Sequence, residues 1–74
     1  MNQREQIYDY MTTFGSITPM EAFADLGITK LATRVSEMRE EGVSIIGEWE
    51  SHKNRYGKKV RYMRYSLKAG DGDD

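Results

Sequence analysis

The stretch that most limits the possible folds is residues 15–42, which contains two helix starts separated by a glycine turn. The first helix should begin at Thr18, whose side chain can cap free backbone N–H groups, and Pro19 follows where a missing N–H costs nothing. Glu21 can complete this cap by bonding back to the Thr18 backbone. The apolar spacing then stops, and Gly27 can adopt the left-handed conformation that ends a helix.

A second helix should follow this turn almost at once, because Thr29 can cap the start of a helix that runs to about Gly42. Leu31, Val35 and Met38 fall at spacings of i, i+4 and i+7, which predicts that one side of this helix faces the core. A short helix, a glycine turn and a longer helix form the frame of a helix-turn-helix motif, whose second helix can enter the major groove of DNA. The spacing indicates the motif and does not by itself establish DNA binding.

The polar face of the second helix carries side chains that could read DNA. Arginine can pair with guanine through two hydrogen bonds, threonine can contact a base edge or a thymine methyl, and lysine can neutralise a phosphate. The same residues would also serve as the solvated side of any amphipathic helix, and the helix pattern leaves both interpretations open. The candidate base-contacting residues are Thr29, Lys30, Thr33, Arg34 and Glu37.

Two stretches further along the chain have the composition and the alternation of β-strands. Residues 43–50 (VSIIGEWE) are rich in β-branched and aromatic side chains, and residues 60–67 (VRYMRYSL) alternate between two faces, with Tyr65 on the apolar one. Residues 51–59 lie between them and predict a long basic tip, so that the two strands form a hairpin. We expect Trp49 to cover the small core.

Another helix should precede the motif, from about Gln3 to Thr13, with Asn2 as its cap. Its expected core face consists of Ile7, Tyr10, Met11 and Phe14, which recur at i, i+3, i+4 and i+7. The segment Ser16–Ile17 could add a short third strand beside the hairpin.

Three helices followed by a two-stranded hairpin describe an α+β fold of the winged helix-turn-helix type. Residues 1–68 are long enough for one small domain with a modest core. Residues 69–74 (AGDGDD) combine glycine freedom with acidic repulsion and have nothing to bury, so we expect a disordered acidic tail.

The net charge of −1 hides an uneven distribution of charge along the chain. Residues 1–50 contain four Lys and Arg against nine Asp and Glu, whereas residues 51–68 contain seven Lys and Arg and no acid. One or two charges would protect the edges of the hairpin from pairing with other chains, so seven without an acid favour a polyanionic partner. The residues expected to contact phosphate are Lys53, Arg55, Lys58 and Lys59, with Tyr56 beside them at the tip.

Composition argues against several other classes of protein. The chain has no cysteine and only one histidine, His52, so we expect no metal site, and a loop position for His52. No nucleophile has an evident base and no glycine-rich phosphate loop is present, so we expect no catalytic residue, no cofactor and no enzymatic activity. No apolar run approaches the length of a membrane span and the polar start is not a signal peptide, so we expect a cytoplasmic protein.

Several of these segments resemble a family of small helix-turn-helix proteins that are encoded mainly by bacteriophages and prophages. The likeness extends over about residues 3 to 67 and implies a winged helix-turn-helix fold, with DNA binding by extension. It rests on core and cap residues, so it transfers no DNA-contacting residue to this chain. The segments that carry it are residues 14–22 (FGSITPMEA), 26–28 (LGI), 31–32 (LA), 34–35 (RV), 38–42 (MREEG) and 64–67 (RYSL), with Gln6 and Ile45.

Two classes of function remain open from the sequence. The first is a protein that binds double-stranded DNA as a phage-encoded regulator of transcription or as an architectural factor. The second is a small protein-interaction module that binds and inhibits a host enzyme or a defence complex, for which an acidic first half could imitate phosphate charge. RNA binding is a distant third, because no strand pair resembles a base-stacking platform. The sequence does not determine whether the protein is a monomer or a dimer.

Overall fold

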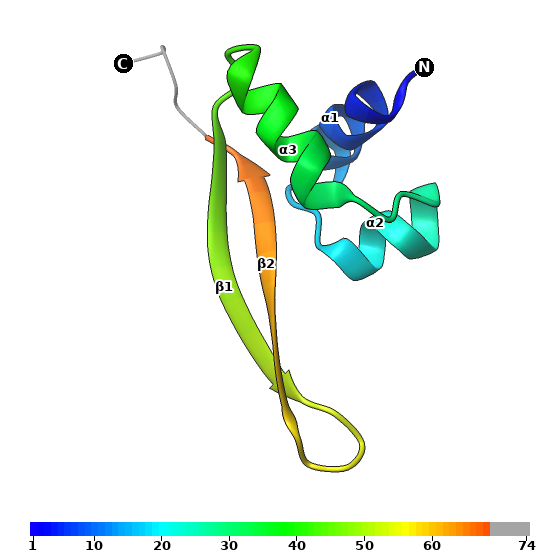
Figure 1. Ribbon diagram of the computed structural model, residues 1–74, viewed down its shortest axis with the longest axis vertical. Helices are drawn as coiled ribbons and strands as arrows, with labels where there is room; N and C mark the ends of the chain where they lie inside the picture. Colours follow the sequence, from blue (N-terminus) through cyan, green and yellow to red (C-terminus); the bar gives the residue numbers. More distant parts are fainter. Residues whose placement is uncertain (69–74) are drawn as a thin grey trace.

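The computed structural model describes residues 1–68, and the disordered tail expected at residues 69–74 lies outside the described residues. The expected order of elements, three helices followed by an antiparallel hairpin, is confirmed. The helices pack together at one end, and the hairpin extends from them as a long arm (Figure 1). The elements are α1 (Gln3–Phe14), α2 (Pro19–Leu26), α3 (Leu31–Glu40), β1 (Ile45–Lys53) and β2 (Lys59–Leu67).

Helix α1 begins after the Asn2 cap as the sequence predicts, and it ends at Phe14, one residue beyond the expected Thr13. The Asn2 side chain accepts a hydrogen bond from the Glu5 backbone N–H, and the Glu5 side chain accepts one from the Asn2 backbone, which makes a reciprocal cap. Ile7 and Met11 are buried, but Phe14 is 69% exposed, so the expectation that it joins the core is wrong. Phe14 is the last residue of the helix, and its ring packs at a tilt of 47° against the ring of Tyr10, with 4.6 Å between the ring centroids.

Helix α2 begins and ends as predicted, but the start of α3 differs from the prediction. The Thr18 and Glu21 cap forms, and Gly27 ends α2 with a φ of 70°, where a side chain would be strained. The expectation that Thr29 caps α3 is wrong. Lys30 occupies the cap position, and the helix starts without a side-chain hydrogen bond, because lysine has only donors to offer at a helix end that needs acceptors.

The core lies where the three helices meet the base of the hairpin. Leu31, Val35 and Met38 of α3 are buried, as their spacing predicts. Trp49 is 62% exposed, so the expectation that it covers the core is wrong. The buried apolar residues are Ile7, Met11, Ile17, Ala22, Ile28, Leu31, Val35, Met38, Ile45 and Tyr65.

The hairpin is longer and its tip is shorter than the sequence suggests. The strands pair as far as Lys53 opposite Lys59, so only residues 54–58 form the tip, not residues 51–59. The Asn54 side-chain oxygen accepts hydrogen bonds from the backbone N–H groups of Tyr56 (2.9 Å) and Lys58 (3.0 Å). Asparagine often closes a turn in this way. The tip is therefore a closed turn that presents its basic side chains outward.

The expected third strand is reduced to one residue. Ile17 forms an isolated antiparallel bridge with Tyr65, with N–H···O distances of 2.8 and 2.9 Å in the two directions. Both side chains are buried. The connection between α1 and α2 is thereby fixed to β2 at the base of the hairpin.

Candidate nucleic-acid interface

The exposed face of α3 is centred on Thr33. A helix turns by about 100° per residue, so Thr33 lies about 200° from the buried Val35. Thr29 and Lys30 are also exposed, in the turn and at the start of the helix. Ser36 belongs to the same exposed surface but was not among the expected contacts. Its spacing of i+3 from Thr33 is the signal that could have found it.

We expected Arg34 and Glu37 to point away from the protein body, but both are partly buried. Arg34 is only about 100° from Val35 around the helix, so it lies at the side of α3. Its Nη1 is 2.9 Å from Glu37 Oε1, and Arg4 Nη1 at the start of α1 is 2.7 Å from Glu41 Oε2 and 4.0 Å from Glu37 Oε1. Arg4 thus links α1 to the C-terminal end of α3, and the pair of Arg34 with Glu37 lies within α3. A base contact by Arg34 stays a prediction, which requires the pair with Glu37 to open.

The two ends of α3 differ in charge. Glu37, Glu40 and Glu41 gather at its C-terminal end, whereas Thr29, Lys30 and Thr33 at the other end include no acid. The N-terminal end of a helix also carries the positive end of the helix dipole. The first turn of α3 is therefore the part that an anionic duplex could approach most closely.

The tip of the hairpin concentrates positive charge. Lys53 and Lys59 lie directly opposite one another in the strand pairing, and like charges in such positions repel. Arg55 and Lys58 lie in the closed turn beyond them, and Tyr56 is 83% exposed. All five expected wing residues are exposed and lie together at the end of the arm. An anion bound between the opposed lysines would relieve their repulsion.

The two faces of the hairpin differ in what they carry. We call them the Trp49 face and the Arg64 face. The Trp49 face consists of Ile45, Gly47, Trp49, Ser51 and Lys53 from β1 and Lys59, Arg61, Met63, Tyr65 and Leu67 from β2, because directly paired residues share a face. The Arg64 face consists of Ile46, Glu48, Glu50 and His52 from β1 and Val60, Tyr62, Arg64 and Ser66 from β2.

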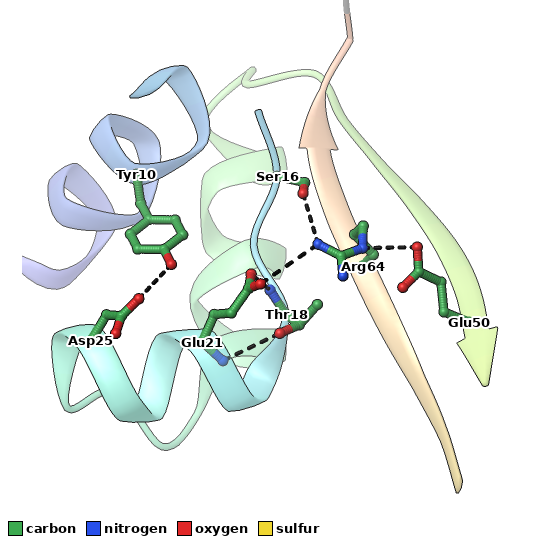
Figure 2. A network of polar contacts seen from close by, with 7 residues as sticks. All are labelled: Tyr10, Ser16, Thr18, Glu21, Asp25, Glu50 and Arg64. Atoms are coloured by element: carbon green, nitrogen blue, oxygen red, sulfur yellow. Dashed lines mark hydrogen bonds and ion pairs between the residues drawn. The ribbon is translucent and has the colours of Figure 1, made fainter. Parts of the chain in front are cut away.

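Arg64 is partly buried and contacts polar side chains from three segments of the chain, as Figure 2 shows. Its Nε lies 2.8 Å from Glu50 Oε2, its Nη1 donates to Ser16 Oγ at 2.9 Å, and Glu21 Oε2 is 3.8 Å from the same nitrogen. The guanidinium lowers the pKa of the Glu50 carboxyl, and in return the carboxylate raises the pKa of Arg64. This network joins both strands to the start of α2, and no local pattern predicts it because its members are far apart in the chain.

Arg39 fixes α3 to the hairpin on the Trp49 face. Its Nε and Nη2 both donate to the Ile45 carbonyl oxygen, at 3.2 and 2.9 Å, and its Cζ is 5.8 Å from the centre of the Tyr65 ring. A Cβ added at Gly47 would lie 3.5 Å from Arg39 Nη2. Arg39 and Arg64 together hold the hairpin at a set position relative to the helices.

Residues 1–68 offer neither a membrane-spanning helix nor a metal-binding cluster. None of the helices there is both long and apolar enough to cross a membrane. No three His, Asp or Glu side chains in this part of the chain gather in an arrangement that could hold a metal ion. The expectation that His52 lies in a loop is wrong, because the strands extend further than predicted and His52 pairs with Val60 within the hairpin.

Comparison with known sequences agrees with this geometry. Residues 2–70 match the family described as "Winged helix-turn-helix domain". No curated protein and no solved structure matched the chain. A winged helix-turn-helix is typically a DNA-binding fold without enzymatic activity. The matched region includes all three helices and the hairpin, and the chain belongs to the winged helix-turn-helix domain family.

Proposed function

We propose that this protein binds double-stranded DNA, with the first turn of α3 in the major groove and the hairpin tip on the phosphate backbone. The observation that carries the proposal is the group of exposed cations at the end of the hairpin, on a domain that belongs to the winged helix-turn-helix family. Most of the other basic side chains in residues 1–68 form ion pairs or hydrogen bonds within the protein, so the tip holds the largest group of positive charges that remain free for a ligand.

The two parts of the interface have different tasks in this proposal. Thr29 and Thr33 contact base edges and Lys30 contacts a phosphate, since all three are exposed at the start of α3. Arg34 and Glu37 join them only when their mutual ion pair exchanges for a base contact. The cations of the tip, with Tyr56, contribute affinity that does not depend on sequence, because phosphate contacts position a protein without reading bases.

The biological role follows as part of the same proposal. The protein acts by occupying a DNA site, as a regulator of transcription or an architectural factor encoded by a phage or prophage. No chemistry, cofactor or metal is involved, and the setting is the cytoplasm of a bacterial host. The likeness of the sequence to small phage helix-turn-helix proteins supports this assignment.

A salt titration of DNA binding tests the proposal. A fluorescently labelled random duplex, followed by anisotropy, should bind at low salt. If about four to six phosphates are contacted, log affinity should fall against log salt with a slope of roughly −4 to −5. Absence of binding near 50 mM salt, or a flat titration, contradicts it. Selection of binding sites from random duplexes would then identify the preferred sequence.

The alternative is a protein-interaction module that inhibits a host enzyme or defence complex. The acidic excess over residues 1–50 favours it, together with the exposed rings of Phe14 and Phe23 on the helical body. Under this alternative, removal of the hairpin cations leaves partner binding intact, and no salt-dependent binding to duplex DNA is observed.

A further inference from the structure

Trp49 and Arg61 form a stacked pair on the hairpin, away from the tip. The Arg61 Cζ lies 4.8 Å from the centre of the Trp49 ring, within the range of a cation–π contact. Most of the Trp49 side chain is open to solvent. The ring therefore buries little of its own surface and serves mainly as a support for the guanidinium.

The two arginines of β2, Arg61 and Arg64, differ in how their charge is used. Arg64 forms an ion pair with Glu50, and both residues lie on the Arg64 face, opposite the Trp49 face. Within residues 1–68, Arg61 takes part in no ion pair and donates no side-chain hydrogen bond to another residue. An arginine stacked on an aromatic ring keeps the N–H groups along its edge available, and these match the oxygens of a phosphate.

The pair lies on the hairpin face that runs from the basic tip to Arg39 in the last turn of α3. Arg61 shares the Trp49 face with Lys59 and Lys53, and Arg39 of α3 lies over the same face near Gly47. A strand rises by about 3.4 Å per residue, so Lys59 and Arg61 are separated by roughly 7 Å along the strand. Each DNA strand carries one phosphate per about 3.4 Å of helix axis, so these two cations can engage different phosphates.

We propose that Arg61, held over the ring of Trp49, is a phosphate-binding site that extends the DNA contact from the hairpin tip along the Trp49 face. The inference rests on the proposed DNA binding. It adds a site two residues inward from Lys59 on β2, where sequence reasoning placed none. Trp49 is the positioning residue, because it restricts the guanidinium before DNA arrives and so reduces the entropy lost on binding.

The first experiment compares Arg61→Gln with Lys68→Gln in the salt titration. Both variants lose one positive charge from an exposed residue, but Lys68 lies past the other end of β2, away from the tip. We expect the slope to shrink by up to about 0.9 for Arg61→Gln and to stay unchanged for Lys68→Gln. Equal slopes for Arg61→Gln and the unaltered protein overturn the inference, as does an equal loss in both variants.

A second pair of variants tests the stack rather than the charge. Trp49→Leu and Arg61→Lys both keep the positive charge but remove the ring or the planar guanidinium. Each should weaken binding roughly three- to tenfold at low salt. Thermal unfolding of the same samples measures any structural role. A melting temperature that falls while affinity stays unchanged would show that the stack stabilises the hairpin only, and the inference fails.

The unaltered protein provides a test that does not depend on whether a variant folds. Trp49 is the only tryptophan in the chain, so its fluorescence reports this site alone. Saturation with duplex DNA should change its emission and reduce its quenching by acrylamide. If the protein binds DNA with a steep salt dependence and neither signal changes, the Arg61 site is wrong while the proposed function stands. If no DNA binds at all, the proposed function fails first.

Discussion

The helical body, formed by α1, α2 and α3, and the hairpin arm differ in how far their side chains are buried and their charges paired. In the body, apolar side chains fill a common core and the surface charges pair with one another, as Arg4 does with Glu41 and Arg34 with Glu37. In the outer arm, few side chains are buried and the cations outnumber the acids. The comparison indicates that the body determines stability and the arm determines affinity for an anionic ligand, so changes in one region should leave the other property nearly intact.

The largest effect should come from the core of the body. Leu31→Ala removes a buried side chain from α3, so we expect the free energy of unfolding to fall by about 2 to 5 kcal/mol. Chemical denaturation measures it. Thr33→Ala in the same helix is the matched control and should change stability by less than about 0.5 kcal/mol, because its side chain is exposed. Comparable losses for both would mean that the face assignment of α3 is wrong.

The arm should show the reverse behaviour. Replacing Lys53, Arg55, Lys58 and Lys59 together with Gln removes charges that bury little, so the melting temperature should hold or rise as the repulsion between Lys53 and Lys59 disappears. The salt slope should shrink by up to about 0.9 for each phosphate that the variant no longer neutralises, equally for preferred and random sequences. A variant that retains both affinity and slope would restrict these cations to solubility and edge protection.

Arg34 tests whether one residue can contribute to both stability and DNA contact. It is an expected DNA contact, and in the folded protein it forms an ion pair with Glu37. We expect Arg34→Ala to lower stability by up to about 1 kcal/mol through the loss of the pair with Glu37. If the pair opens on DNA, the same change relaxes sequence preference at one base pair by about 1 to 3 kcal/mol. Binding-site selection with both proteins measures this preference, and an unchanged preference removes Arg34 from the contact set.

The smallest effect should be the pH dependence of the ion pair between Arg64 and Glu50. Arg64 lowers the pKa of Glu50 in the folded protein. The ion pair therefore stabilises the folded protein fully above the pKa that Glu50 has in the unfolded chain, and this stabilisation is lost as pH falls through the lower pKa of the folded protein. The melting temperature of the unaltered protein should therefore exceed that of Glu50→Gln at neutral pH, and the gap should close in acid. Glu48→Gln, on the same face, is the control. A gap that persists at low pH contradicts the role of the ion pair.

The parts that sequence reasoning predicted are those with local causes. Thr18, Glu21 and Gly27 determine the ends of α2 through contacts a few residues apart, and the spacing of Leu31 and Val35 identifies the buried side of α3. Local patterns also place the cations at the hairpin tip, although whether they bind DNA remains a prediction.

The errors concern residues whose surroundings are set by distant parts of the chain. Trp49 has the parity of a core residue, but it lies nearer the tip than the buried Ile45 and Tyr65 and is 62% exposed. Arg64 finds acidic partners that depend on helix placement and strand register, which no short window of sequence contains. The same limit hid Arg61, because its stacking on Trp49 appears only once the register is known.

The bridge between Ile17 and Tyr65 has a consequence for how motion is distributed along the arm. An isolated two-stranded ribbon is marginally stable in water, so the outer pairs of this hairpin depend on the anchored base. The Ile17 and Tyr65 amides are held in a buried pair, and their hydrogens should exchange with solvent only when the body unfolds. Exchange should become faster with each step toward Lys53 and Lys59. The hairpin thus has a fixed base and a flexible tip. The tip can follow the curvature of a ligand while the core stays folded.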